Sequence, residues 1–239
     1  MLRYSRILDK NQREITLLKS RPCKWGRCSF CDYIDDNCSN DQDIISFNQN
    51  VLSNITGEFK KLEIVNSASV FELPEECLRD IKDIVVDKGI EKLYFESHYS
   101  YKDRLGEIRD YFKGIDIVFK CGIETFDNDF RNKYLKKGVH FNDYEEVAKY
   151  FKSICLLVGI QGQTKEMISK DIEIIQNYFE HACINIYVEN STLVKRDGEI
   201  IAWFKEEYSY LDKHDNIEIL WDNTDFGIGG SADERKETC

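Results

Sequence analysis

Short apolar segments alternate with amphipathic segments along most of the chain. The apolar segments are typical of buried strands and lie at residues 15–20, 61–69, 92–100, 115–125, 154–162, 183–191 and 216–226. Between them, apolar residues recur at helical spacing and predict helices at 43–61, 73–89, 101–114, 143–153, 164–180 and 198–213. Pro74, Gly89 and Thr164 stand at positions that suit helix ends. The pattern therefore predicts about seven strands separated by helices.

Each predicted strand is apolar along nearly its whole length. Parallel strands that are buried on both faces have this character. Seven repeats of strand and helix predict an α/β fold, a partial (β/α)6–7 barrel similar to a TIM barrel. A doubly wound open sheet is the alternative, but no GxGxxG motif follows the first strand.

Small and polar residues gather directly after the predicted strands. In parallel α/β folds the carboxyl ends of the strands carry the functional site. We therefore expect six loops to meet at one rim, and these are residues 66–69, 96–100, 124–125, 159–164, 189–192 and 222–225.

The net charge of −11 and the absence of a long apolar stretch limit the classes of function. Nucleic-acid affinity depends mainly on Lys and Arg, so an acidic chain disfavours a tRNA or DNA substrate. A membrane span needs about 20 apolar residues, and none is present. The polar N-terminal segment lacks the features of a signal peptide. We expect a cytoplasmic protein with reduced thiols and no membrane association.

Nine cysteines are distributed unevenly along the chain. Four lie close together at Cys23, Cys28, Cys31 and Cys38. Four others stand singly in apolar runs and are expected to be small buried side chains: Cys77, Cys121, Cys155 and Cys183.

The segment RPCKWGRCSFCDY, residues 21–33, places three cysteines within nine residues. One interpretation is a structural zinc site with Cys38 as the fourth ligand. A second is a chance group of reduced thiols in a surface loop. The third is an iron–sulfur cluster held by Cys23, Cys28 and Cys31, with one iron left open for another ligand.

This loop resembles the signature of the radical S-adenosylmethionine (radical SAM) superfamily. That signature is Cys-x3-Cys-x2-Cys after the first strand of a partial barrel, with an aromatic residue before the last cysteine. Here Phe30 precedes Cys31, but the first gap has four residues. A loop can absorb one extra residue, and Gly26 is the residue that we expect to permit it.

Three later segments resemble motifs of the superfamily, in the subgroup of oxygen-independent coproporphyrinogen oxidase and the elongator-type enzymes. Asn66-Ser67-Ala68-Ser69 stands where relatives receive the amino group of SAM. By its position Glu124 is a polar contact of SAM, and Lys136 matches a basic residue that pairs with the SAM carboxylate. The fifth-strand segment 156–166 also matches, but Cys155 replaces an acidic ribose ligand, so we assign the ribose hydroxyls to Glu96.

The resemblance covers roughly residues 15–180 and implies a 4Fe–4S cluster and SAM as cofactors. In such enzymes one electron cleaves SAM to a 5′-deoxyadenosyl radical, which abstracts a hydrogen atom from the substrate. The electron would come from a donor such as flavodoxin or ferredoxin. We expect one domain over residues 1–239, in which 181–239 complete the barrel and supply the substrate side.

The substrate is expected to be a small molecule held inside the barrel. Carboxylates and amides near strand ends suit an amine or the N–H edge of a purine-like base. The candidates are Tyr33, His98, Glu189, Asn190, Asp222 and Asp225. Asp222 and Asp225 could equally shape a turn before Gly227.

In size and acidic character the chain also resembles small radical SAM lyases of gut clostridia. That resemblance implies cleavage of the free base queuine to 7-aminomethyl-7-deazaguanine, for salvage of the queuosine precursor. The alternatives are a radical SAM enzyme that modifies tRNA and a zinc-stabilised binding protein.

Overall fold

A computed structural model describes residues 3–222 of the chain. Two compact units are present, and β5 (Asp116–Glu124) passes from one to the other. Of the described residues, 3–26 and 33–119 belong to the first unit, and 27–32 and 120–222 to the second. The strands follow one another in chain order, from β1 to β8. The prediction of one domain stays a prediction.

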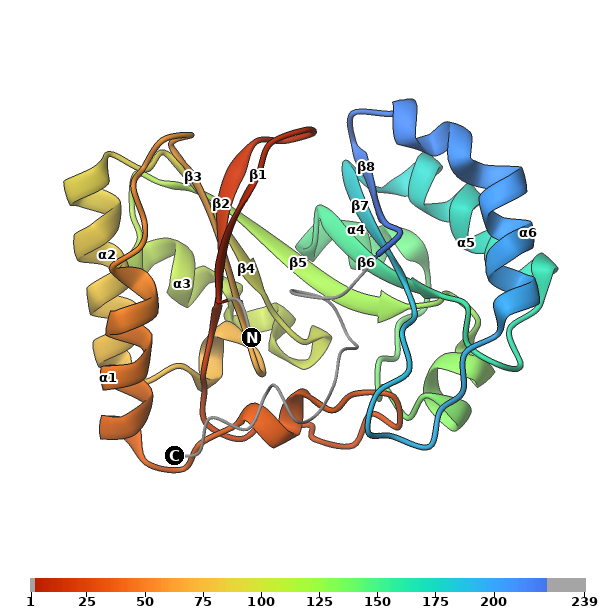
Figure 1. Cartoon of the computed structure of the whole chain (residues 1–239), viewed down its shortest axis with the longest axis horizontal. Helices are drawn as coiled ribbons and strands as arrows, with labels where there is room; N and C mark the ends of the chain where they lie inside the picture. Colours follow the sequence, from red (N-terminus) through yellow and green to blue (C-terminus); the bar gives the residue numbers. More distant parts are fainter. Residues whose placement is uncertain (1–2, 223–239) are drawn as a thin grey trace. The chain divides into compact units, whose positions relative to one another are not determined.

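The first unit contains β2 (Arg13–Leu18), β3 (Lys61–Asn66) and β4 (Lys92–Glu96), which pair in parallel. Helices α1 (Asp41–Leu52), α2 (Glu75–Lys88) and α3 (Leu105–Tyr111) connect these strands and lead on to β5 (Figure 1). All six residues of β2 are buried. The register pairs Leu18 with Asn66, so the loops that follow β2 and β3 begin side by side.

The second unit repeats this arrangement with β6 (Ser153–Val158), β7 (His181–Ile186) and β8 (Ile217–Leu220), again in parallel. Helix α4 (Tyr144–Tyr150) precedes β6, and α5 (Lys165–Tyr178) and α6 (Gly198–Tyr208) connect the three strands. Within the described residues, none of the helices is long and apolar enough to cross a membrane.

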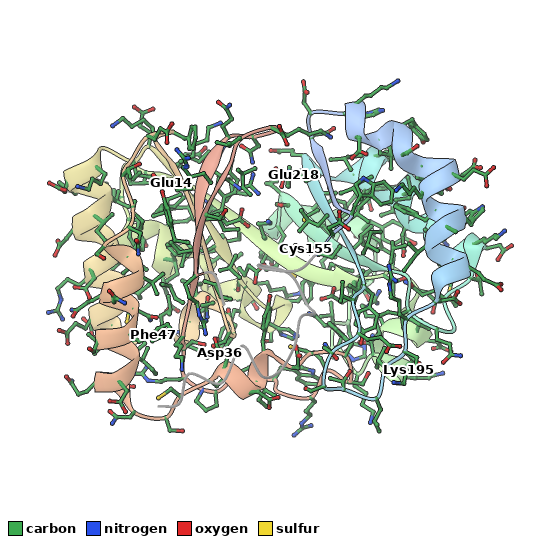
Figure 2. The ribbon with its side chains drawn as sticks, in the orientation of Figure 1. Glu14, Asp36, Phe47, Cys155, Lys195 and Glu218 are labelled. Carbon is green, nitrogen blue, oxygen red and sulfur yellow. The ribbon has the colours of Figure 1, made fainter. Side chains whose placement is uncertain are left out.

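One strand was not predicted. β1 (Tyr4–Ile7) pairs with β2 in antiparallel register, so the described chain has eight strands, and not seven. The segment is short and polar, and one of its side chains also bonds to a residue of β2. The buried carboxylate of Glu14 accepts a hydrogen bond from the Tyr4 hydroxyl at 2.8 Å (Figure 2).

Glu14 also explains why the helix predicted at 43–61 ends at Leu52. Its carboxylate accepts hydrogen bonds from the backbone N–H groups of Thr56 and Gly57, both at 2.7 Å. Gly57 has a φ of 80°, and a Cβ there would lie 2.7 Å from the Cβ of Lys88. The segment after α1 therefore follows a course that a helix cannot take.

Two other predicted helical boundaries need correction, and two caps are confirmed. Segment 101–114 is divided between a 3₁₀ turn (Tyr99–Arg104) and α3. Segment 198–213 likewise ends in a 3₁₀ turn (Ser209–Lys213) after α6. Thr164 caps α5 by accepting from the Met167 N–H, and Gly89 ends α2 with a left-handed φ of 61°.

Candidate functional site

The cysteine loop is divided between the two units. Cys23 and Gly26 belong to the first unit, and Cys28 and Cys31 to the second. Gly26 has a φ of 53°, and a Cβ at this position would lie 3.0 Å from the carbonyl oxygen of Cys23. A glycine is therefore required where the longer first gap of the cysteine motif turns, as the sequence predicted.

The three cysteines of the loop differ from the others in exposure. Cys23, Cys28 and Cys31 are half-buried thiols, whereas the four singly placed cysteines are buried, as predicted: Cys77, Cys121, Cys155 and Cys183. Cys38 is buried as well. Within residues 3–222 no group of three or more His, Cys, Asp or Glu side chains converges on a metal position. The loop therefore offers three half-buried thiols, a donor set that fits an iron–sulfur cluster.

In the first unit, the end of β3 holds the backbone of Cys23 through Asn37. The Asn37 Oδ1 accepts a hydrogen bond from the Cys23 N–H at 3.2 Å. Its Nδ2 donates to the carbonyl and the hydroxyl oxygens of Ser67, each at 2.9 Å. Ser67 also receives the N–H of Ser20, which ends the segment after β2. The predicted strand-end motif is therefore joined to the cysteine loop.

Asn66 presents an unused acceptor at the end of β3. Its Nδ2 donates to the carbonyl of Ser69 at 3.0 Å, which bends the chain sharply. Its Oδ1 is buried and has no hydrogen-bond partner within residues 3–222. Buried polar atoms are almost always paired, so this oxygen suits a donor supplied by a ligand, such as an ammonium group.

Glu72, which sequence reasoning missed, organises the same end of the first unit. Its carboxylate accepts hydrogen bonds from the N–H of Ser69 at 3.0 Å and of Lys24 at 3.3 Å. It also accepts from the Tyr101 hydroxyl at 2.5 Å, and burial together with this carboxylate raises the pKa of Tyr101. No sequence motif includes Glu72, and only its hydrogen bonds reveal its role.

Three other candidates lie in the first unit. The imidazole of His98 stacks on the indole of Trp25, with 5.8 Å between the ring centroids. Glu96 is half-buried and ends β4, and Tyr33 is half-buried and begins a 3₁₀ turn (Tyr33–Asp36). His98 is therefore associated with the cysteine loop through Trp25.

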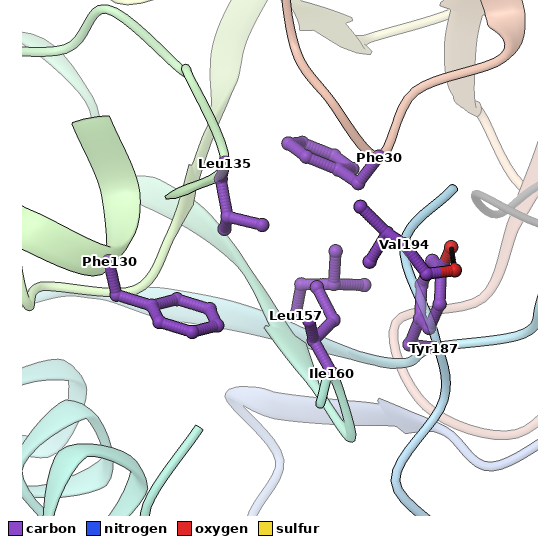
Figure 3. Close-up of a cluster of buried hydrophobic side chains, with 7 residues drawn as sticks. All are labelled: Phe30, Phe130, Leu135, Leu157, Ile160, Tyr187 and Val194. Atoms are coloured by element: carbon purple, nitrogen blue, oxygen red, sulfur yellow. Dashed lines mark hydrogen bonds between the residues drawn. The ribbon is translucent and has the colours of Figure 1, made fainter. Parts of the chain in front are cut away.

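In the second unit, Phe30 anchors the turn between Cys28 and Cys31 in a hydrophobic cluster (Figure 3). Its ring is 1% exposed, and Cys28 and Cys31 pack against the cluster. The other members are Phe130, Leu135, Leu157, Ile160, Tyr187 and Val194. Burial of one such ring stabilises the fold by roughly 1.5–3 kcal/mol. Phe30, the aromatic residue of the motif, thus packs the turn between Cys28 and Cys31 against the hydrophobic core of the second unit.

Glu124 and Lys137 form a buried ion pair in the second unit. The Lys137 Nζ lies 2.6 Å from Glu124 Oε1, and the two side chains are 13% and 3% exposed. Although burial opposes the charged form, Glu124 and the nearby Cys28 raise the pKa of Lys137. Sequence reasoning selected Lys136 from the same pair of lysines, but Lys136 is exposed. Because the two lysines are identical and adjacent, the sequence alone could not show which of them pairs with Glu124.

The backbone around this pair is irregular. Glu124 and Lys136 have φ values of 67° and 52°, in the left-handed region that non-glycine residues rarely occupy. The register between β5 and β6 shifts between Gly122 and Glu124. Strained residues and strand irregularities concentrate at functional sites, so this end of β5 is a further candidate region.

The remaining candidates follow β7 and β8. Glu189 receives the backbone N–H of Arg196 at 3.1 Å, and the Asn190 Nδ2 donates to the carbonyl of Phe30 at 2.8 Å. Asp222 is exposed and follows β8. Asp225 lies outside the described residues, so its predicted role has no structural counterpart.

Comparison with known proteins identifies the family. No family model matches the chain, and no curated protein does. Among solved structures, the queuine lyase from Clostridium spiroforme, bound to SAM and queuine, shares 53% identity, with a TM-score of 0.91. That match covers 95% of this chain and 98% of the other.

A radical SAM methyltransferase from Sphaerobacter thermophilus is 12% identical, with a TM-score of 0.59 over 87% of this chain and 65% of the other, and shows likeness of fold alone. Both matches agree with the predicted fold class, a partial α/β barrel of the radical SAM type. At this level of identity and coverage to the clostridial protein, the chain belongs to the queuine lyase family of the radical SAM superfamily.

Proposed function

We propose that the chain is a radical SAM lyase that cleaves queuine to 7-aminomethyl-7-deazaguanine. The observation that carries this proposal is the relative bound to SAM and queuine, which is 53% identical over 95% of the chain. The acidic net charge of −11 favours a small molecule with a cationic amine over a nucleic acid. The reaction would serve salvage of the queuosine precursor.

The proposed ligands of a 4Fe–4S cluster are Cys23, Cys28 and Cys31. Two observations support this assignment: their thiols are more exposed than those of the other described cysteines, and Cys28 lies near a buried cation, Lys137. A positive charge favours a thiolate, which is the form that binds metals. When bound, the cluster supplies the electron that cleaves SAM to the 5′-deoxyadenosyl radical.

The proposed contacts of SAM are Asn66, Ser67, Ser69, Glu96, Glu124 and Lys136. Asn66 is the strongest of them, because its buried Oδ1 needs a donor such as the amino group of SAM. Lys137 is added to this set, because its ammonium is fixed by Glu124 close to Cys28. A fixed cation there could balance the carboxylate of SAM.

The proposed substrate contacts are Tyr33, His98, Glu189, Asp222 and Asp225. Carboxylates suit the secondary amine and the N–H edge of a deazaguanine. Asn190, which the sequence suggested for the same role, also donates to the carbonyl of Phe30 in the cysteine turn. An electron donor such as flavodoxin or ferredoxin and a cytoplasmic location complete the proposal.

The test is anaerobic reconstitution of the purified chain with iron and sulfide, followed by reaction with SAM, a reductant and queuine. Mass spectrometry should detect 5′-deoxyadenosine and 7-aminomethyl-7-deazaguanine together. Cys28→Ser should abolish both products, whereas Cys38→Ser should retain them, because Cys38 is not among the three proposed ligands. A colourless protein that binds zinc in place of iron would contradict the proposal. A reaction with queuosine-containing tRNA but not with the free base would favour the tRNA alternative.

A further inference from the structure

The turn between Cys28 and Cys31 forms hydrogen bonds with two other segments of the second unit, residues 134–135 and Asn190. The N–H of Ser29 donates to the carbonyl of Leu135 at 3.0 Å, and its hydroxyl donates to the carbonyl of Tyr134 at 2.7 Å. Within the turn, the N–H of Cys31 donates to the carbonyl of Cys28 at 3.4 Å. The carbonyl of Phe30 accepts from Asn190.

The Phe30 carbonyl and the Cys31 N–H belong to the same peptide group. A peptide group is planar, so a bond that fixes the carbonyl also fixes the direction of the N–H. The Asn190 Nδ2 reaches the Phe30 oxygen at 2.8 Å, across 160 residues of chain. Asn190 therefore fixes the orientation of the peptide that carries Cys31.

The amide oxygen of Asn190, Oδ1, accepts hydrogen bonds from residues near it in the chain. Its Oδ1 accepts hydrogen bonds from the N–H and the hydroxyl of Thr192, at 3.0 and 2.7 Å. The Tyr187 hydroxyl also donates to it at 3.4 Å, and Tyr187 is fully buried in the cluster of Figure 3. Both polar atoms of Asn190 are therefore bonded to protein groups.

In the first unit an asparagine also bonds the backbone of a loop cysteine, but as an acceptor where Asn190 is a donor. Asn37 accepts the N–H of Cys23 and donates to Ser67 at the end of β3. In each unit, an asparagine amide thus joins the peptide group of a loop cysteine to the end of a strand. Both contacts restrict the backbone from which a loop thiol projects, one through an N–H and the other through a carbonyl.

We propose that Asn190 and Asn37 are positioning residues for the cysteine ligands, and that Asn190 acts on Cys31 through the Phe30 carbonyl. The inference rests on the proposed function, because it assumes that these thiols hold a cluster. Groups that orient metal ligands commonly affect metal affinity by about 10- to 100-fold when they are removed.

Asn190→Asp tests the proposal with little change of shape. The carboxylate still accepts from Thr192 and Tyr187 but cannot donate to Phe30, and it places negative charge against that carbonyl. Asn177→Asp is the matched control, because Asn177 donates to the carbonyl of Glu173 at 2.9 Å and both residues are on the exposed face of α5. Both variants change the charge equally. Asn190→Ala removes the same donor without adding charge.

The measurement is the rate at which an iron chelator bleaches the reconstituted protein under anaerobic conditions. Asn190→Asp and Asn190→Ala should lose iron about tenfold faster than wild type and Asn177→Asp, with an altered electron paramagnetic resonance spectrum of the reduced cluster. The unfolding temperature of the metal-free protein should change equally little in N190D and N177D.

If wild type takes up iron and all variants lose it at the same rate as wild type, this inference is overturned and the proposed function is not. Faster loss that is accompanied by a large fall in the unfolding temperature of metal-free N190D and N190A would also overturn it, because it would indicate a general defect of folding. A wild-type chain that takes up no iron would instead overturn the proposed function.

Discussion

The ammonium of Lys137 lies 2.6 Å from the carboxylate of Glu124, and the same ammonium lies 5.6 Å from the centre of the Phe30 ring. A buried pair that loses one partner leaves the other charge without compensation. Lys137→Met should therefore destabilise the protein by about 3–5 kcal/mol in urea unfolding.

The matched control for this change is Lys133→Met. Lys133 pairs with Asp129 at 2.8 Å, but both side chains are exposed. An exposed pair contributes about 0–1 kcal/mol, so the loss should be small. Equal destabilisation by the two substitutions would contradict a special role for the buried pair.

Gly122→Ala should disturb the same pair without disturbing the fold. A Cβ at Gly122 would lie 2.5 Å from Glu124 Oε1 and 2.9 Å from Lys137 Nζ. Both atoms are ends of flexible side chains, so the pair moves while the backbone stays. We expect SAM affinity, measured calorimetrically on the reconstituted protein, to fall about tenfold, as for the loss of one charged hydrogen bond.

Gly106→Ala is the control for that measurement. Gly106 lies in α3, and a Cβ there would meet nothing within 4 Å. Alanine should stabilise the helix by about 0.5–1 kcal/mol and leave SAM affinity unchanged. Unchanged affinity in Gly122→Ala would separate the ion pair from SAM binding.

Asn66→Ala should weaken SAM binding more than it weakens the fold. The Asn66 Oδ1 has no partner in the described chain, so the only side-chain hydrogen bond that alanine removes there is the one from Nδ2 to the Ser69 carbonyl, which contributes about 1 kcal/mol. If the amino group of SAM is its donor, affinity should fall about tenfold. Thr16→Val removes another buried oxygen that lacks a partner within residues 3–222, and it should leave affinity unchanged. Equal affinities in both variants would remove Asn66 from the proposed site.

Asp171 should make stability depend on pH. Burial raises the pKa of this carboxyl from 3.8 to about 7, although the Phe126 N–H bonded to it and nearby Arg131 oppose the rise. The folded chain therefore retains a proton that the unfolded chain releases. The contribution of Asp171 to the free energy of unfolding is greatest below about pH 4 and is lost as the pH rises through about 7.

Asp171→Asn should remove this dependence, because the amide does not titrate. The measurement is the free energy of unfolding in urea between pH 5 and pH 8, and the fall over this range should be smaller in the variant than in wild type. Asp129→Asn, which changes an exposed carboxylate, should preserve the fall. A wild-type fall that persists in Asp171→Asn would assign it to other groups.

The order of strands and helices could be predicted from the sequence, because burial on both faces of a parallel strand requires a continuous apolar run. The chain confirms seven predicted strands and the caps at Thr164 and Gly89. β1 escaped prediction because the segment is short and polar, so no local apolar pattern indicates its antiparallel pairing with β2. Gly26 was predictable, because an extra residue in a tight loop requires a permissive backbone.

By itself the sequence determined the family resemblance, the three cysteines of the loop and the strand ends at which polar residues gather. These features can be read from the sequence because they depend on residue type and spacing among neighbouring residues. Only the tertiary structure showed that Lys137 pairs with Glu124 and that Asn190 bonds to the cysteine turn. The physical reason is that burial and hydrogen bonding depend on partners far away in sequence, such as Phe30 for Asn190, which only the folded chain brings together.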